Sequence, residues 1–277
     1  MTHSDIQNIK AIDFHSHFGD WNHQKSPPGA YAFINGGETF LLENMAYSNI
    51  CISINSHCYA VFPRGDVDAA AGNRMGAEAV ERLRGVYLWA VVNPLQPETY
   101  AQAAELLKRE KCFGIKIHPE EHRYPITQYG GEIYEFAAKH HAVIETHSGE
   151  SWSMPEDFCV FADRYPEVRT IVSHLGCGWD KNFRHQITAI LNSRNHNIFT
   201  DTSSAQSLNC NIIEIAVSEI GSENILFGTD SGCYYSPCQR ARIDCARISD
   251  QDKANILCQN GLRLFPQLKK AYEELSK

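Results

Sequence analysis

The stretch from residue 142 to residue 174, AVIETHSGESWSMPEDFCVFADRYPEVRTIVSH, contains one complete strand–helix–strand unit. Residues 142–147 form a short apolar run rich in β-branched side chains, which is typical of a buried strand. Residues 155–165 have helical periodicity and begin with proline, as the first turn of a helix often does. Residues 168–174 return to the strand pattern, so the stretch predicts two parallel strands joined by a covering helix.

The same alternation runs along the 277 residues of the chain. Strands are expected at residues 11–17, 46–55, 86–93, 112–118, 142–147, 168–174, 197–202 and 225–230. Helices are expected at residues 38–43, 66–83, 97–110, 131–140, 155–165, 181–195, 208–220 and 250–265, with a helical extension at 271–277. Because a barrel of eight strand–helix units typically needs ~250 residues, we predict a single (β/α)₈ TIM barrel domain over residues 1–277.

An open, doubly wound sheet is the rival architecture for such a pattern. It usually carries a glycine-rich nucleotide-binding sequence, G-x-G-x-x-G or G-x-x-x-x-G-K-[ST]. Neither occurs here, and the nearest stretch, Gly176-Cys177-Gly178, lacks the third glycine. The eight evenly spaced runs therefore favour the closed barrel.

The composition is that of an ordinary globular protein. Apolar residues make up 43% of the chain and charged residues 21%, and the formal net charge is −8. A negative chain does not attract phosphate backbones or anionic lipid, so we expect no nucleic-acid or membrane partner, and a homo-oligomer is left open. The N-terminus lacks the pattern of a signal peptide, and the ten cysteines include no C-x-x-C pair, so we expect a cytoplasmic protein with reduced thiols.

Histidines and one aspartate end several of the predicted strands. His15 and His17 alternate at the end of the first run, so both imidazoles face the same side. His147, His174 and Asp230 are each the last residue of the fifth, sixth and eighth runs. In a barrel of this kind the carboxyl ends of the strands share one face, which is where active sites are assembled.

Three or four imidazoles with a carboxylate suit one divalent metal ion, such as zinc. A bound metal ion can lower the pKa of its water toward ~7 and so provide a nucleophile at neutral pH. The sequence therefore predicts an enzyme with one divalent metal ion and a small-molecule substrate.

Five stretches of the chain resemble the amidohydrolase superfamily, and more narrowly its amidohydrolase-related ("amidohydrolase 2") branch. They are Ile12-Asp13-Phe14-His15-Ser16-His17, Gly114-Ile115-Lys116-Ile117-His118-Pro119, Thr146-His147-Ser148-Gly149, Val172-Ser173-His174-Leu175-Gly176 and Phe227-Gly228-Thr229-Asp230. The resemblance implies that His15, His17, His147 and Asp230 bind the metal ion. It also implies that His174 orients the metal-bound water as a catalytic acid or base and that Asp230 accepts a proton.

The resemblance leaves the reaction open. We expect a hydrolase that acts on an amide, ester or lactone; the alternative is a metal-dependent decarboxylase of an aromatic or unsaturated carboxylic acid. A barrel that merely stores or senses a metal ion would not need the extra histidine at position 174.

Lys116, in the fourth predicted strand, has two interpretations. Some members of the superfamily carry a carboxylated lysine there that bridges two metal ions. We instead favour a buried ion pair with Glu145 or Asp13, since a buried lysine needs a partner.

The loops after the strands are expected to select the substrate, because loops at this face of a barrel carry specificity. They are rich in aromatic and basic side chains, namely Trp21, His23, Tyr31, His57, Tyr59, Arg64, His122, Arg123, Trp152, Tyr234 and Tyr235. Arg64 or Arg123 could hold a substrate carboxylate by a bidentate contact.

Overall fold

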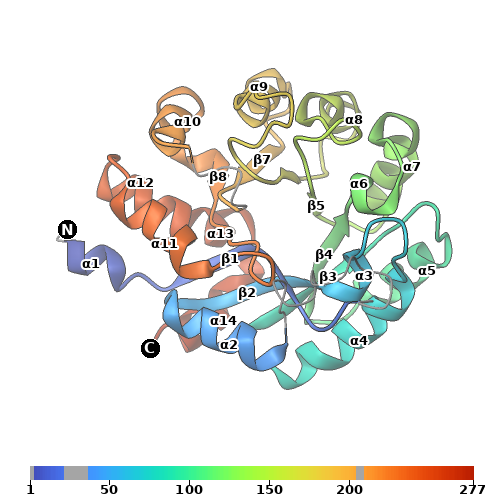
Figure 1. The fold of residues 1–277 in the computed structure, drawn as a ribbon, viewed down its shortest axis with the longest axis horizontal. Helices are drawn as coiled ribbons and strands as arrows, with labels where there is room; N and C mark the ends of the chain where they lie inside the picture. The colour runs from blue at the N-terminus through green and yellow to red at the C-terminus, as the bar shows by residue number, and fades with distance from the viewer. Residues whose placement is uncertain (1–2, 22–36, 204–208) are drawn as a thin grey trace.

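The computed structural model describes residues 3–21, 37–203 and 209–277, and eight parallel strands form a ring inside a layer of helices (Figure 1). The strands follow one another in sequence order around the ring, and each pairs in parallel with the next. They are β1 (Ala11–Phe18), β2 (Ile50–His57), β3 (Val86–Val91), β4 (Cys112–Ile117), β5 (Ile144–Thr146), β6 (Thr170–Val172), β7 (Ile198–Asp201) and β8 (Ile225–Leu226). The predicted (β/α)₈ TIM barrel is confirmed.

The ring closes between β1 and the segment that follows β8. The Phe14 amide donates to the Phe227 carbonyl at 2.9 Å, and the Asp230 amide donates to the His15 carbonyl at 2.7 Å. The Asp13 carboxylate accepts a hydrogen bond from Thr229 Oγ1 at 2.6 Å. These contacts fix Asp230 beside the two histidines of β1.

Most of the described helices lie between successive strands, one precedes β1 and the others follow β8, and together they surround the barrel (Figure 1). They are α1 (His3–Gln7), α2 (Glu38–Tyr47), α3 (Cys58–Val61), α4 (Ala69–Arg82), α5 (Glu98–Leu106), α6 (Pro119–His122), α7 (Ile126–Lys139), η3 (Pro155–Phe158), α8 (Cys159–Arg164), α9 (His185–Asn192), α10 (Ile212–Ile220), η5 (Ser222–Asn224), α11 (Ser236–Cys245), α12 (Asp250–Ala254), η6 (Asn255–Gln259), α13 (Asn260–Leu264), η7 (Pro266–Leu268) and α14 (Lys269–Leu275). Within the described part of the chain, no helix is long and apolar enough to cross a membrane.

Several predicted boundaries are wrong. The second strand starts at residue 50 rather than 46, because residues 46 and 47 end α2. The helix expected at 131–140 begins at residue 126, and the one expected at 181–195 covers only 185–192. The α10 helix begins at residue 212, whereas the start expected at residue 208 lies outside the described residues.

The helix α11 has no counterpart in the sequence prediction, because its buried face is polar. Gln239, Arg240 and Asp244 are all buried there. The Arg240 guanidinium pairs with Asp244 and donates to the carbonyl of Ile9. Without an apolar stripe, the periodicity that marks other helices is missing.

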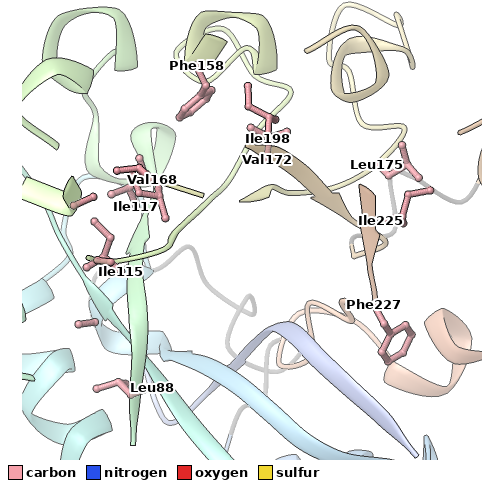
Figure 2. Packing of buried hydrophobic residues seen from close by; sticks show 14 of the residues in the cluster. Leu88, Ile115, Ile117, Phe158, Val168, Val172, Leu175, Ile198, Ile225 and Phe227 are labelled. Carbon is pink, nitrogen blue, oxygen red and sulfur yellow. The ribbon is translucent and has the colours of Figure 1, made fainter. Parts of the chain in front are cut away.

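Apolar side chains fill the space between the barrel and its helices. Figure 2 shows part of this layer, with Ile115 and Ile117 from β4, Ile198 from β7 and Ile225 from β8. These residues are fully buried against apolar side chains of the covering helices. This layer keeps the strand ends, and therefore the side chains on them, in fixed positions.

A second apolar cluster forms the floor of the barrel interior. The rings of Phe14, Trp89, Phe113 and Phe265 pack edge to face or tilted, at centroid distances from 4.9 to 5.8 Å. The pairing of β1 with β2 changes register between Asp13 and Ser16. Over this stretch β1 advances by three residues while β2 advances by two, so β1 contains a bulge. Such a bulge changes which residues face inward, so Phe14 joins the floor and His15 and His17 still face the interior above it.

Candidate metal centre

His15, His17 and Asp230 converge above this floor, at the carboxyl end of the barrel. Asp230 Oδ1 lies 3.2 Å from His17 Nε2 and 3.6 Å from His15 Nε2. One ligand atom from each residue lies within 4.8 Å of the others, and all three residues are buried. Two imidazole nitrogens and a carboxylate oxygen at this spacing suit a divalent metal ion.

The electrostatics keep His17 and Asp230 in their metal-binding protonation states. Burial would lower the pKa of His15, by contrast, but the carboxylates of Glu145 and Asp201 raise it. Burial lowers the pKa of His17 despite its hydrogen bond with Asp230, which favours the neutral imidazole. Burial alone would raise the pKa of Asp230, but the hydrogen bond from His17 and the nearby imidazoles hold it far below its usual value. Neutral imidazole and ionised carboxylate are the forms that bind metal ions.

Both β1 histidines are oriented through the ring nitrogen that faces away from Asp230. His17 Nδ1 lies 2.8 Å from Ser56 Oγ. His15 Nδ1 lies 3.2 Å from Asp201 Oδ2 and 3.1 Å from Glu145 Oε1. Polar partners of this kind typically fix the tautomer of a metal-binding histidine and leave Nε2 free for the metal ion.

Asp201 is a site residue that the sequence analysis did not identify. It is fully buried at the end of β7, and its carboxylate also accepts hydrogen bonds from the His174 and Ser203 amides. Burial would raise its pKa, but His15 and the hydrogen bonds keep the pKa far below the usual value. In the sequence, the sign that this residue has a special role is that it is a carboxylate within the predicted strand 197–202.

His147 and His174 reach the same cavity but lie beside the trio. His147 Nδ1 is 3.0 Å from His174 Nε2, and His147 Nε2 is 2.9 Å from Glu150 Oε1. His174 Nδ1 lies 2.7 Å from Ser203 Oγ, and His174, His15 and Asp201 form a second group of potential metal ligands. The role of His147 as a metal ligand therefore stays a prediction, as does the acid or base role of His174.

The predicted strand ends at these positions need correction. β5 ends one residue before His147, β6 two residues before His174 and β8 four residues before Asp230, whereas His15 and His17 lie within β1. His174 and Asp230 have left-handed backbones, with φ of 71° and 55°. Residues other than glycine seldom adopt this conformation, and those that do are concentrated at functional sites.

Lys116 forms the expected buried ion pair with Glu145. Its Nζ lies 2.7 Å from the Glu145 carboxylate, and both side chains are almost completely buried. Lys116 Nζ is also 3.3 Å from His15 Nε2, so the pair borders the trio. Asp13, the other suggested partner, is instead bonded to Thr229 and to the His15 amide.

A cavity of about 190 Å³ opens above these residues. Its described lining consists of His15, His17, Phe62, Arg64, His118, Glu121, His147, Glu150, His174, Cys177, Trp179, Asp230, Cys233 and Tyr234. Arg64 lies between two carboxylates, 3.1 Å from Glu121 and 3.3 Å from Glu150. The mouth of the cavity therefore has aromatic side chains and two carboxylates, those of Glu121 and Glu150, whose charge Arg64 partly neutralises.

Of the loop residues suggested from sequence that the structure describes, two, Arg64 and Tyr234, line this cavity. His57 and His122 turn into the protein: His57 accepts a hydrogen bond from the Tyr59 amide, and His122 Nε2 lies 3.0 Å from the Ala60 carbonyl. The other described residues suggested from sequence that do not line the cavity are Trp21, Tyr59, Arg123, Trp152 and Tyr235. His23 and Tyr31 lie outside the described residues.

Buried histidines and an aspartate at the carboxyl face of a TIM barrel are typical of enzymes that assemble their active sites at this face. The sequence profile of the amidohydrolase family matches residues 12–267, so the chain belongs to this family and is an amidohydrolase-family enzyme. Among curated proteins, none matches the sequence.

Three solved structures are similar to this chain over nearly their whole length. They are 2,6-dihydroxybenzoate decarboxylase from Rhizobium, 5-carboxyvanillate decarboxylase from Sphingomonas paucimobilis and dihydroxybenzoic acid decarboxylase from Polaromonas sp. JS666 with bound manganese and 2-nitroresorcinol. Their TM-scores are 0.72, 0.69 and 0.70, at 16%, 12% and 18% identity. In each case 93% of this chain is covered, with 98%, 99% and 97% of the other chain, which shows a shared fold.

We predict that Glu145→Gln lowers the free energy of unfolding by about 3 to 5 kcal/mol, because it leaves the Lys116 ammonium buried without its counter-charge. Glu135→Gln, on the exposed side of α7, is the matched control and should change stability by less than about 0.5 kcal/mol. Urea denaturation of both variants measures the difference. Equal stability of the two variants would contradict a structural role for the pair.

Proposed function

We propose that the protein is a metal-dependent decarboxylase of a small aromatic carboxylic acid. The observation that carries this proposal is the buried trio of His15, His17 and Asp230 at the bottom of a cavity with aromatic walls. The similarity of the whole barrel to three aromatic acid decarboxylases supports it and favours this reaction over the hydrolysis expected from sequence.

His15, His17 and Asp230 would hold one divalent ion, and His147, which lines the same cavity, would complete the ligand set. When bound, this ion supplies positive charge that polarises oxygen atoms of the substrate. The Polaromonas relative contains manganese, whereas the ligand types also suit zinc. We propose a divalent ion of either kind.

The cavity walls suit a flat, ring-shaped substrate. Phe62 packs edge-on against His17 at a centroid distance of 5.4 Å, so an aromatic surface adjoins the metal-binding atoms. Trp179 and Tyr234 line the same cavity from the connections after β6 and β8. Aromatic rings bind well against such edges and faces, while a few polar groups fix their orientation.

Decarboxylation breaks the bond between a ring carbon and its carboxyl carbon. The electron pair remains on the ring carbon, which takes up a proton as carbon dioxide leaves. His174 and His147 share a hydrogen bond of 3.0 Å, so one ring donates and the other accepts. We propose that His174, oriented by Ser203, supplies the proton, while the hydrogen bond with His147 fixes the position of its Nε2.

We predict that the metal-loaded protein releases carbon dioxide from at least one member of a panel of hydroxybenzoates. The same panel should include lactones and amides, with product analysis by mass spectrometry. Chelation should abolish the activity, and manganese or zinc should restore it, because the polarising charge comes from the ion. Hydrolysis of a lactone or amide without carbon dioxide release would overturn the proposal in favour of a hydrolase.

We predict that His174→Ala retains nearly all of the bound metal ion but lowers turnover by ~10² to 10⁴-fold, as loss of a general acid or base does. His147→Ala should instead lose metal. His196→Asn, at an exposed turn between α9 and β7, is the control for histidine replacement. Elemental analysis, melting temperature and turnover are compared, and equal metal loss from the His174 and His147 variants would show that the role of His174 is wrong.

A further inference from the structure

His185 lies outside the metal centre and bridges two carboxylates from different segments. It is the first residue of α9, and its side chain is 8% exposed. Its Nδ1 lies 2.8 Å from Glu156 Oε1 of η3, and its Nε2 lies 3.0 Å from Asp180 Oδ2 in the connection between β6 and α9. Both ring nitrogens can donate to these carboxylates at once only when the imidazole is protonated.

The connection that carries Asp180 also carries Trp179, whose indole lines the cavity although the residue is 59% exposed. The Trp179 amide donates to the Gly149 carbonyl at 3.0 Å, and the Asn182 amide donates to Asp180 Oδ1 at 2.9 Å. A side chain at Gly178 would collide with the Asn182 carbonyl, so the turn needs glycine there. Trp179 is thus held by one backbone hydrogen bond on one side and by the Asp180–His185 contact on the other.

Two charged groups act on the His185 imidazole, Glu156 from η3 and Asp180 from the connection before α9. Burial would lower the pKa of His185, but the hydrogen bonds and charges of these carboxylates raise it above the usual value. Arg184, its neighbour in sequence, forms a separate ion pair with Glu219 of α10. Since the folded-state pKa is raised, the stabilisation is complete below the unfolded pKa and is lost as the pH rises through the folded value.

We propose that His185 is a positioning residue that holds the Trp179 segment, residues 177–182, against the mouth of the cavity. The protonated imidazole donates one hydrogen bond to Asp180 and one to Glu156. This bridge keeps Trp179 over the bound substrate. Deprotonation leaves one N–H for two carboxylates, so the hydrogen bond to Asp180 weakens and the mouth opens. The effect on substrate binding rests on the proposed function, whereas the effect on Trp179 itself does not.

The first test follows Trp179 by acrylamide quenching of fluorescence across a pH range on both sides of ~6.5, the ordinary histidine pKa. Subtracting the signal of Trp179→Phe isolates this indole from the other three tryptophans. In the parent protein, quenching of Trp179 should increase as the pH rises. In His185→Gln it should be high and independent of pH, because glutamine cannot carry the charge.

Two further variants sharpen this test. Glu156→Gln removes one counter-charge, so the midpoint of the transition should move to lower pH. His141→Asn, in the exposed connection between α7 and β5 at the other end of the barrel, should behave like the parent. Quenching of Trp179 in His185→Gln that matches the parent at every pH, with the melting temperature unchanged, would overturn the proposal.

The second test uses a substrate identified by carbon dioxide release. His185→Gln should raise KM about fivefold, which corresponds to roughly 1 kcal/mol, with kcat nearly unchanged. A fall in kcat at constant KM would contradict a positioning role at the mouth. Absence of any decarboxylase activity would overturn the proposed function. The role of His185 would then be decided by the fluorescence measurement alone.

Discussion

The hydrogen bonds that join β1 to the segment after β8 are the contacts on which the rest of the site depends. They bring the last βα connection back to the first strand, with the Asp230 amide on the His15 carbonyl and Thr229 on the Asp13 carboxylate. Residues more than two hundred positions apart thereby become neighbours. Closure of the barrel and assembly of the trio are one structural event.

The interior above the aromatic floor buries an unusual amount of charge. Among the described residues, three carboxylates, those of Glu145, Asp201 and Asp230, lie within 3.6 Å of the His15 ring nitrogens, compared with one ammonium, that of Lys116. Burying uncompensated carboxylates is costly, so the arrangement favours a further positive charge at this point. Burial lowers the pKa of His15, but Glu145 and Asp201 more than offset this and raise it, which is the response of an imidazole that faces an excess of negative charge.

The sequence predicts the barrel and brings together several residues of the candidate site, because both depend on local patterns. Eight β-branched runs at regular intervals are enough for the fold, and the alternation of His15 and His17 is enough to place two imidazoles on one face. The bulge in β1, which turns Phe14 toward the floor while Asp13 bonds to Thr229, leaves no local signal. Its position depends on pairing with β2, and the sequence of β1 alone does not determine that pairing.

Other features could not be predicted because they depend on contacts between distant segments. Asp201 is important only because β7 places it opposite His15 Nδ1, and Glu150 only because its loop returns to His147. Trp179 lies after a strand like several other aromatic residues, yet it reaches the cavity while Trp152 does not. The direction in which a loop turns decides whether its aromatic side chain reaches the cavity. Hydrogen bonds to neighbouring loops set this direction, as the hydrogen bond from the Trp179 amide to the Gly149 carbonyl does.

We propose that His15, His17 and Asp230 hold the catalytic metal ion. Anomalous diffraction from crystals of the manganese-loaded protein tests it most directly, because it locates the ion without reference to activity. We expect one strong anomalous peak per chain, bounded by Nε2 of His15, Nε2 of His17 and the Asp230 carboxylate. A peak between His174 and Asp201 instead, or two peaks bridged by a modified Lys116, would contradict the account.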